Sequence, residues 1–213
     1  MLQSQVIAFI GTVGSGKSTQ MKLLAEYFKS NGLKTRITWF KVGNYWAYPL
    51  YKIASTGRPI FKNKCLFKLW MILDMFAISL KFLISIWLPS KVGYTVLVEE
   101  YLPSIAADYL HIARINRYSP KDVWAIITLI YKLSILVPFS SVFLDANDII
   151  LRERWKLRGT PNENPNYLFM QRKLLLPLAK LLSYHLVYIN TSDRTVKEIN
   201  HRLKAHIIRL TSP

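Results

Sequence analysis

A glycine-rich stretch near the N-terminus constrains the fold of this chain more than any other feature. The stretch 11–19 reads Gly-Thr-Val-Gly-Ser-Gly-Lys-Ser-Thr and fits the pattern G-x-x-x-x-G-K-[ST] of phosphate-binding loops. An apolar run at 6–10 precedes it, and a run at 20–28 with apolar residues at helical spacing follows it. We therefore expect a buried strand, a glycine loop and a helix in succession, which is the context that this motif requires.

The residue types of the loop suit the phosphates of a nucleoside triphosphate. Glycines at 11, 14 and 16 allow successive amides to turn inward at a helix N-terminus, where the helix dipole favours negative charge. Lys17 would reach the β- and γ-phosphates, and the Ser18 hydroxyl would hold Mg²⁺. The candidate residues for binding the nucleotide are Gly11, Thr12, Val13, Gly14, Ser15, Gly16, Lys17, Ser18 and Thr19.

Size and composition are typical of a single folded domain in a reducing compartment. With 213 residues, 51% of them hydrophobic, the chain is long enough for one sizeable α/β domain, and we expect residues 1–213 to form it. The single cysteine, Cys65, excludes an internal disulfide and fits a reducing cytoplasm. We expect no secretory signal, because the first apolar run is committed to the strand before the loop.

The chain is strongly basic, with 29 Lys and Arg against 12 Asp and Glu and a formal net charge of +17. A solvated basic surface with some phosphate sites, nucleic-acid binding and attraction to an anionic membrane surface all fit this charge. The basic residues are scattered along the chain, which favours the first interpretation. No recognised nucleic-acid-binding motif is present, so nucleic acid stays a partner without motif support.

Two long apolar runs could be mistaken for membrane spans. The run 65–88 has the length to cross a bilayer, but Lys68, Asp74 and Lys81 interrupt it, and charge at mid-span is costly in lipid. A similar run at 123–139 carries one lysine. We expect both to be helices buried against a sheet, with membrane contact as the less favoured alternative.

The remaining segments alternate between strands and helices, which predicts an α/β fold with a parallel sheet. Strands are expected at 34–40, 94–98, 141–144 and 186–189, in addition to 6–10. Helices are expected at 149–157 and 167–182 and after a capping box at 195–198, and irregular segments at 42–59 and 159–166. Ligands of such sheets bind at the carboxyl ends of the strands. The polar residues expected there are Lys41, Glu99, Glu100, Asp145 and Asn190.

The order of these motifs resembles that of thymidylate kinases, within the P-loop nucleoside and nucleotide kinases, over the whole chain. Besides the loop at 11–19, the match rests on Asp145 followed by Arg154 and Arg158, and on a short loop at 159–166 that is similar to the small lid of this family. Asn190 begins a segment that resembles the loop lining the adenine of ATP.

The resemblance implies a P-loop kinase fold, a five-stranded parallel sheet between helices, and ATP- and Mg²⁺-dependent phosphoryl transfer, most simply from ATP to dTMP. It gives Lys17, Arg154, Arg158 and Glu99 catalytic roles, Ser18 and Glu99 the metal, and Asn190 a place beside the nucleotide. It also implies that a homodimer could form through the apolar helices.

The chain departs from the family where the acceptor would bind. The family ends its third strand with Asp-Arg-Tyr, whereas this chain has Glu99-Glu100-Tyr101. Glu99 could still bind Mg²⁺ or act as a base, but Glu100 replaces an arginine that neutralises the phosphate of the acceptor. Two further acceptor-side arginines are also missing, one after the second strand and one where Asp74-Met75 stands in the long apolar run.

Several alternatives therefore stay open for the acceptor. Lys41, Arg58, Arg114 or Arg117 could replace the missing arginines, or the acceptor could be a hydroxyl, as in the related deoxynucleoside kinases, where a carboxylate serves as base. The chain could instead be a basic P-loop ATPase acting on nucleic acid or at a membrane, or a kinase relative without acceptor chemistry.

Overall fold

The computed structural model describes residues 5–40, 62–161 and 165–211, and the segment predicted to be irregular at 42–59 lies outside these ranges. One parallel sheet runs through the molecule, with the strand order β2-β3-β1-β4-β5. The strands are β1 Val6–Gly11, β2 Thr35–Trp39, β3 Thr95–Glu99, β4 Ser140–Asp145 and β5 His185–Asn190. This sheet confirms the predicted α/β class, and each predicted strand is present.

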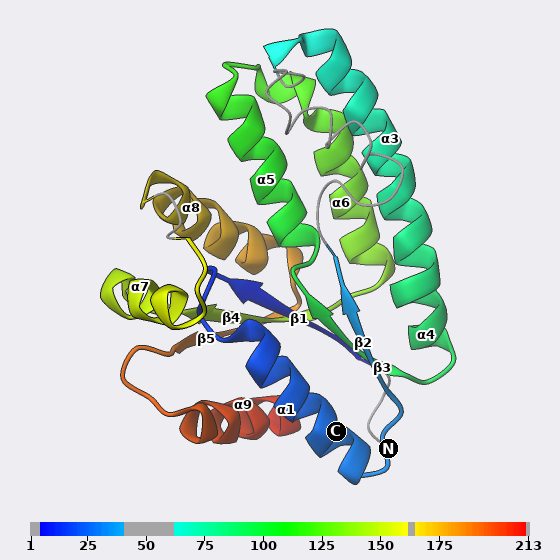
Figure 1. Cartoon of the computed structure of the whole chain (residues 1–213). Coiled ribbons are helices and arrows are strands. Elements are labelled where there is room, and N and C mark those ends of the chain that lie inside the picture. The colour runs from blue at the N-terminus through cyan, green and yellow to red at the C-terminus, as the bar shows by residue number, and fades with distance from the viewer. Residues whose placement is uncertain (1–4, 41–61, 162–164, 212–213) are drawn as a thin grey trace.

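Helices cover both faces of the sheet (Figure 1). They are α1 Lys17–Ser30, α3 Lys64–Phe82, the π-helical turn η3 Leu83–Trp87, α4 Leu88–Lys91, α5 Leu102–Ile115, the 3₁₀ turn η4 Pro120–Asp122, α6 Trp124–Leu136, α7 Asp148–Leu157, α8 Pro165–Leu182 and α9 Val196–Thr211. The sequence analysis did not predict α5, although Pro103 in its first turn and apolar residues at helical spacing signal it.

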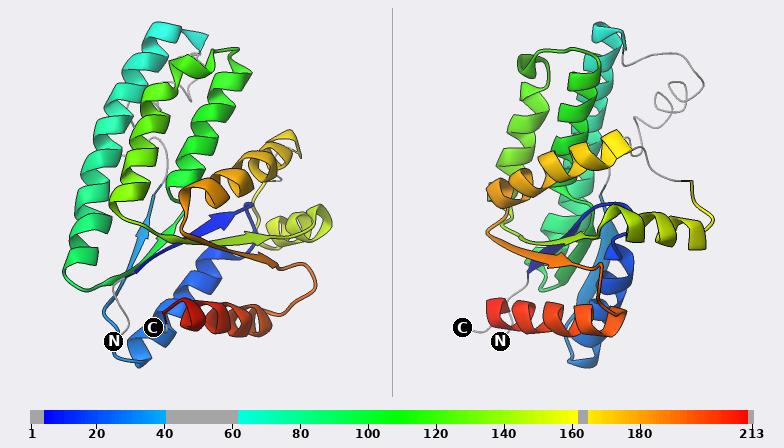
Figure 2. Two further views of the ribbon diagram at one scale, coloured as in Figure 1. Left: turned by 180° about the vertical axis from the view of Figure 1, so that it is seen from behind. Right: turned by 90° about the vertical axis from the view of Figure 1, so that its left-hand side faces the viewer.

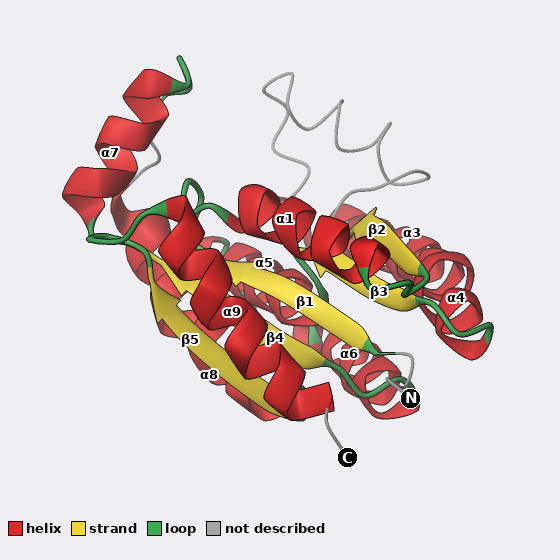
Figure 3. Ribbon diagram, turned by 90° about the horizontal axis from the view of Figure 1, so that it is seen from below, coloured by secondary structure: helices red, strands yellow, loops and turns green. Residues whose placement is uncertain are grey.

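The central strand β1 is buried on both faces, as its continuous apolar sequence predicts. Ile7 and Phe9 pack in the core beneath α1 and α9, whereas Val6 and Ala8 pack in the core shared with α3, α5 and α6. Figure 3 shows α1 and α9 lying across one face of the sheet, with α3, α5, α6 and α8 behind it. The first helix ends at Asn31-Gly32 as expected, since the Gly32 amide donates to Lys29 O.

The strand order fixes where a ligand can approach. β1 lies between β3 and β4, so the loop that follows β1 emerges between the carboxyl ends of those two strands. Glu99 ends β3 on one side of the loop and Asp145 ends β4 on the other. This is the switch point of a doubly wound sheet, where such folds bind their ligands.

The apolar run 65–88 forms a helix, as predicted, but the expectation that it is buried is wrong for one of its faces. Its inner face packs into the core, where Asp74 is fully buried and accepts a hydrogen bond of 2.7 Å from the Tyr109 hydroxyl. Its outer face leaves Ile72 and Phe76 61% and 65% exposed. By length and composition Lys64–Lys91 is the one described helix that could cross a membrane, and 39% of its most apolar window is buried.

The helix continues from α3 to α4 through the π-helical turn η3. Pro89 follows this turn and has no amide to donate to the Ser85 carbonyl one helical turn earlier. The wider π turn accommodates this missing bond, as π-bulges commonly do in long helices. The result is one continuous rod that lies along the molecule from residue 64 to residue 91.

Replacing Gly11 by Ala should destabilise the fold strongly. Gly11 has a φ of 134°, and a Cβ built on it would lie 1.8 Å from the backbone oxygen of Leu144 on β4. Strain and overlap together predict a loss of about 3 kcal/mol or more in the free energy of unfolding, measured by urea denaturation.

The control is Gly93→Ala in the turn before β3. Gly93 also has a positive φ, 85°, but a Cβ there would meet no heavy atom within 4 Å. This variant should lose only the ~1–2 kcal/mol of a left-handed backbone conformation. Equal losses in the two variants would show that the contact with β4 carries no energetic weight.

Candidate functional site

The phosphate loop has the geometry that its sequence predicts. Gly14 and Gly16 have φ values of 88° and 95°, and α1 begins directly afterwards at Lys17. Lys17 is buried and its Nζ donates to the carbonyl oxygens of Gly11 (3.0 Å) and Thr12 (2.9 Å). The ammonium group is therefore held over the loop, and the unpaired amides of the first turn of α1 point out of the same end of the helix.

Ser18 and Glu99 meet across the mouth of this loop. The Ser18 hydroxyl donates a hydrogen bond of 2.6 Å to Glu99 Oε1, and the pairing of Phe9 with Glu99 in the sheet places β3 for this contact. A hydroxyl and a carboxylate are oxygen donors that suit Mg²⁺. In the described ranges no group of three or more His, Cys, Asp or Glu could hold a metal ion. Mg²⁺ would therefore take most of its ligands from phosphates and water.

Asp145 joins the phosphate loop to β4. Its carboxylate is 9% exposed and accepts hydrogen bonds from the Thr12 hydroxyl (2.9 Å), the Ala146 amide (2.8 Å) and Arg172 Nε (3.0 Å). A buried carboxylate is stable only when it is paired and hydrogen-bonded in this way. Asp145 thus fixes the wall of the loop instead of facing solvent.

Arg172 on α8 is a residue that the sequence analysis missed. It forms ion pairs with Asp145 (3.0 Å) and Asp148 (2.6 Å), and its third nitrogen donates to Ala146 O at 2.6 Å. Burial opposes its charge, but the hydrogen bonds that Arg172 donates to these carboxylates, with their charge attraction, outweigh burial and raise the pKa of Arg172. Arg172 is 27 positions from Asp145, and no local spacing links the two residues.

Arg154 on α7 connects the phosphate loop to the end of β5. Its guanidinium donates to Gly14 O (3.3 Å), Thr191 Oγ1 (3.0 Å) and Thr191 O (2.7 Å). Its neighbour Trp155 is buried and donates from Nε1 to Val13 O at 3.2 Å. Burial and the nearby Arg158 both lower the pKa of Arg154. The three groups that the guanidinium contacts are uncharged. Its positive charge therefore lies beside the loop, and none of these three contacts is with a carboxylate.

The other predicted nucleotide-side residues lie farther from the loop floor. Arg158 is the C-terminal cap residue of α7 and is exposed. Asn190 ends β5 opposite Asp145, and its Oδ1 accepts a hydrogen bond of 2.9 Å from the Ser192 amide, which shapes the turn after the strand. The structure thus brings Arg154 to the loop and places Asn190 at the carboxyl end of β5, with its side chain in a turn.

The lid and the candidate replacement cations are described in part. Of the loop predicted at 159–166, residues 162–164 lie outside the described ranges and α8 already begins at Pro165. Lys41 and Arg58 also lie outside them. Arg114 is described near the far end of α5, about 15 Å along the helix axis from Ser104 in its first turn.

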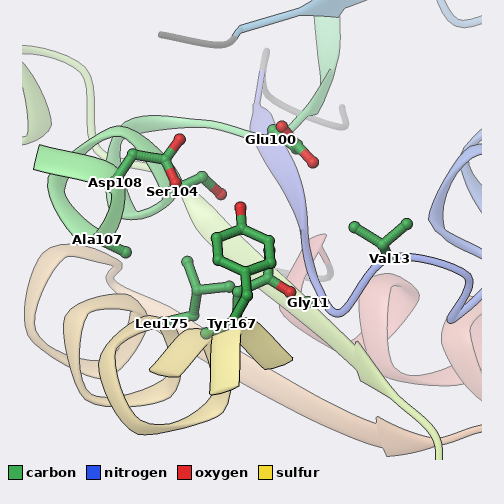
Figure 4. Close-up of a pocket in the computed structure, with 9 residues that line it drawn as sticks. Gly11, Val13, Glu100, Ser104, Ala107, Asp108, Tyr167 and Leu175 are labelled. Atoms are coloured by element: carbon green, nitrogen blue, oxygen red, sulfur yellow. The ribbon is translucent and has the colours of Figure 1, made fainter. Parts of the chain in front are cut away.

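A pocket of about 70 Å³ opens beside the phosphate loop, between α5 and α8. In Figure 4 Glu100 and Ser104 face this pocket from the β3–α5 side, and the Tyr167 hydroxyl points toward them from α8. The lining residues are Gly11, Val13, Glu100, Ser104, Ala107, Asp108, Tyr167, Gln171 and Leu175. No lysine or arginine is among them in the described part of the chain, whereas two carboxylates are.

Glu100 has an unusual backbone conformation at the edge of this pocket. Its φ is 51°, in the left-handed region, and its amide donates to Phe9 O at 3.0 Å. A non-glycine residue there costs about 1 kcal/mol or more, and such strain is concentrated at functional sites. The conformation turns the chain sharply from β3 into α5, so that Tyr101 is fully buried while Glu100 lines the pocket.

Comparison with known proteins supports the fold and goes no further. No protein-family model and no curated protein sequence matches this chain. Among solved structures, a thymidylate kinase from Ehrlichia chaffeensis is similar, with a TM-score of 0.58 and 20% sequence identity, over 97% of this chain and 99% of that one. The chain therefore has the fold of P-loop kinases, as its sequence predicted.

Removing the guanidinium of Arg172 should destabilise the site strongly. Arg172→Gln leaves the nearly buried Asp145 carboxylate without its charged partner, so we expect a loss of about 2–3 kcal/mol in the free energy of unfolding. The measurement is urea denaturation in the absence of nucleotide.

A surface ion pair provides the matched control. Lys64 pairs with Asp122 at 2.9 Å, but its side chain is 55% exposed. Lys64→Gln should lose less than about 1 kcal/mol, because exposed pairs are weak. The assignment of Asp145 as an anchor fails if the two variants lose the same stability.

Proposed function

We propose that this protein is an ATP- and Mg²⁺-dependent kinase of a nucleotide or nucleoside. The observation that carries the proposal is the donor site: a glycine loop at a helix N-terminus, with Lys17 over it, Ser18 and Glu99 at its mouth, and Arg154 beside it. Phosphate binding needs such converging amides and cations. The ion pairs and hydrogen bonds around Asp145 hold the loop, the end of β4 and α8 together.

The chain's own residues hold the donor by charge and position, without covalent catalysis. The amides of the loop and the Lys17 ammonium bind the β- and γ-phosphates. Ser18 and Glu99 would hold Mg²⁺, which when bound would neutralise charge that develops on the transferring group. Arg154 adds a second cation beside the loop, and Arg158, four residues later on the same helix face, would join it at the γ-phosphoryl group as that group transfers.

The simplest acceptor is dTMP, giving dTDP. This follows from the resemblance of the sequence to thymidylate kinases and from the similar fold of the Ehrlichia chaffeensis enzyme. A monophosphate requires a cation at its own phosphate, and the candidates remain Lys41, Arg58, Arg114 and Arg117, of which the first two lie outside the described ranges.

A hydroxyl acceptor, such as a nucleoside, is a second candidate that one observation favours. Glu100 faces the pocket beside the phosphate loop, where a phosphate dianion would be repelled but an alcohol could be deprotonated. Glu99 is held by the Ser18 hydroxyl on the metal side, whereas Glu100 lines the pocket, together with Asp108.

Lys17→Ala should abolish ATP turnover. Removing the ammonium that lies over the loop leaves the γ-phosphate without its main protein cation, so we expect acceptor-dependent ADP release to fall at least about a hundredfold. ADP is measured by a coupled spectrophotometric assay. Lys22→Ala, an exposed lysine on the same helix, should leave the rate unchanged. ADP release that is indifferent to every nucleotide and nucleoside would contradict a kinase.

The variant Glu100→Gln distinguishes a nucleoside acceptor from a nucleotide acceptor. With a nucleoside such as thymidine, loss of the base should lower kcat about 10²–10⁴-fold. With dTMP, loss of a repelling charge should instead raise kcat/KM. Both compounds are assayed with the wild type and the variant at saturating ATP and Mg²⁺. A variant whose rates match the wild type with both compounds would remove Glu100 from the acceptor site.

A further inference from the structure

Two neighbouring helices on the side of the sheet away from α1 and α9 expose stripes of large apolar side chains. On α3 the stripe follows the spacing i, i+3, i+7, and on α6 it follows i, i+7, i+11. The residues, between 49% and 67% exposed, are Leu69, Ile72, Phe76, Trp124, Tyr131 and Ile135. We call these two stripes the α3–α6 face. Figure 2 shows both helices side by side when the molecule is viewed from behind.

This face has no role in the donor site or in the pocket beside it. Single exposed apolar residues are common on protein surfaces, but repeated ones on one helix face mark a surface that contacts something apolar. α3 continues without interruption into η3 and α4, where Leu83, Ile84 and Leu88 are also about half exposed. The exposed apolar surface therefore extends along most of the rod.

Lysines are the exposed charged residues of these described helices, and two of them, Lys64 and Lys68, pair with Asp122. Lys64, Lys68 and Lys91 lie exposed toward the two ends of the α3–α4 rod, and Lys132 is exposed on α6. Within these described helices the only carboxylate is that of Asp74, which is fully buried. Asp122, at the start of the α6 segment, pairs with Lys64 and Lys68 and has only 9% of its side chain exposed.

The rod lies along the protein surface and is held there by its inner face. Asp74 accepts a hydrogen bond from Tyr109 of α5, while Phe67, Trp70 and Ile78 are buried in the core. If the helix left the domain and crossed a bilayer, its inner face would no longer cover the core, and the Asp74 carboxylate would lie in hydrocarbon. The geometry thus suits a helix that rests on a bilayer surface, and opposes one that crosses it.

We propose that the α3–α6 face docks on the surface of an anionic lipid membrane. Apolar side chains on one face, lysines at its edges and aromatic residues such as Trp124 and Tyr131 are the features of interfacial binding. A net charge of +17 adds long-range attraction to anionic headgroups. The sequence-based preference for no membrane contact assumed that the helix is buried, and the exposed outer face of α3 removes that assumption.

Charge complementarity favours lipid over a second copy of the chain. Two copies meeting through this face would bring lysines together without an exposed carboxylate on these helices to pair with them, and each copy carries +17. Like charges at an interface oppose association. An anionic headgroup layer supplies the missing negative charge.

The test is co-sedimentation of the full chain with vesicles, without nucleotide, so its result is independent of any kinase assay. Vesicles of phosphatidylcholine containing phosphatidylglycerol are compared with pure phosphatidylcholine vesicles. The wild type should bind the anionic vesicles, and binding should weaken as salt is raised. Absence of sedimentation with the anionic vesicles at low salt would overturn the proposal.

Two pairs of variants locate the contact. Ile72→Ser with Phe76→Ser should reduce the vesicle partition coefficient by about tenfold or more. The matched control, Phe169→Ser with Leu181→Ser, removes similarly exposed residues from α8 and should leave partitioning unchanged.

The lysine variants test the contribution of charge. Lys91→Gln with Lys132→Gln should lower the vesicle partition coefficient roughly fivefold per lysine. Lys22→Gln with Lys197→Gln, on α1 and α9, should lower it less. Equal losses in test and control variants would contradict the assignment of this face.

Size-exclusion chromatography with light scattering distinguishes the second copy. The proposal expects a monomer whose mass is the same for the wild type and for Ile72→Ser with Phe76→Ser. A wild-type dimer that this substitution dissociates would assign the face to self-association and overturn docking on lipid.

Discussion

The buried carboxylate of Asp145 is the contact on which the site depends. It receives the hydroxyl of Thr12 from the phosphate loop and the guanidinium of Arg172 from α8, so three segments far apart in the sequence meet at one charge. A carboxylate in this position is tolerated only because its partners surround it. The loop, the end of β4 and α8 are consequently held as one unit. The clamp from Arg154 to Thr191 extends that unit to the end of β5.

The parts of this architecture that depend on local sequence could be predicted. The spacing of its glycines predicts the phosphate loop, and apolar runs between turn residues predict the five strands. The capping box before α9 was also predicted and is confirmed, since Thr195 and Glu198 exchange hydrogen bonds. In each case the signal lies within about ten residues of the element that it predicts.

The parts of the architecture that depend on tertiary contacts could not be predicted from the sequence. Arg172 was missed because its partners Asp145 and Asp148 lie on other elements, and no local pattern distinguishes it from a surface arginine. The exposed face of α3 was misjudged for a similar reason. An apolar helix has the same sequence whether one side or all sides are covered, and only the placement of α5 and α6 decides which. The contacts of Arg154 with Gly14 and Thr191 also join separate elements, so no local pattern predicts them.

The close approach of Gly11 to β4 has a consequence for how this site can change. The atom that a side chain at position 11 would meet belongs to the main chain of Leu144, and every amino acid carries that atom. No compensating substitution on the neighbouring strand can therefore create room. A redesigned loop would have to move β1 and β4 apart, which would break the pairing of Gly11 with Leu144 beneath the phosphate loop.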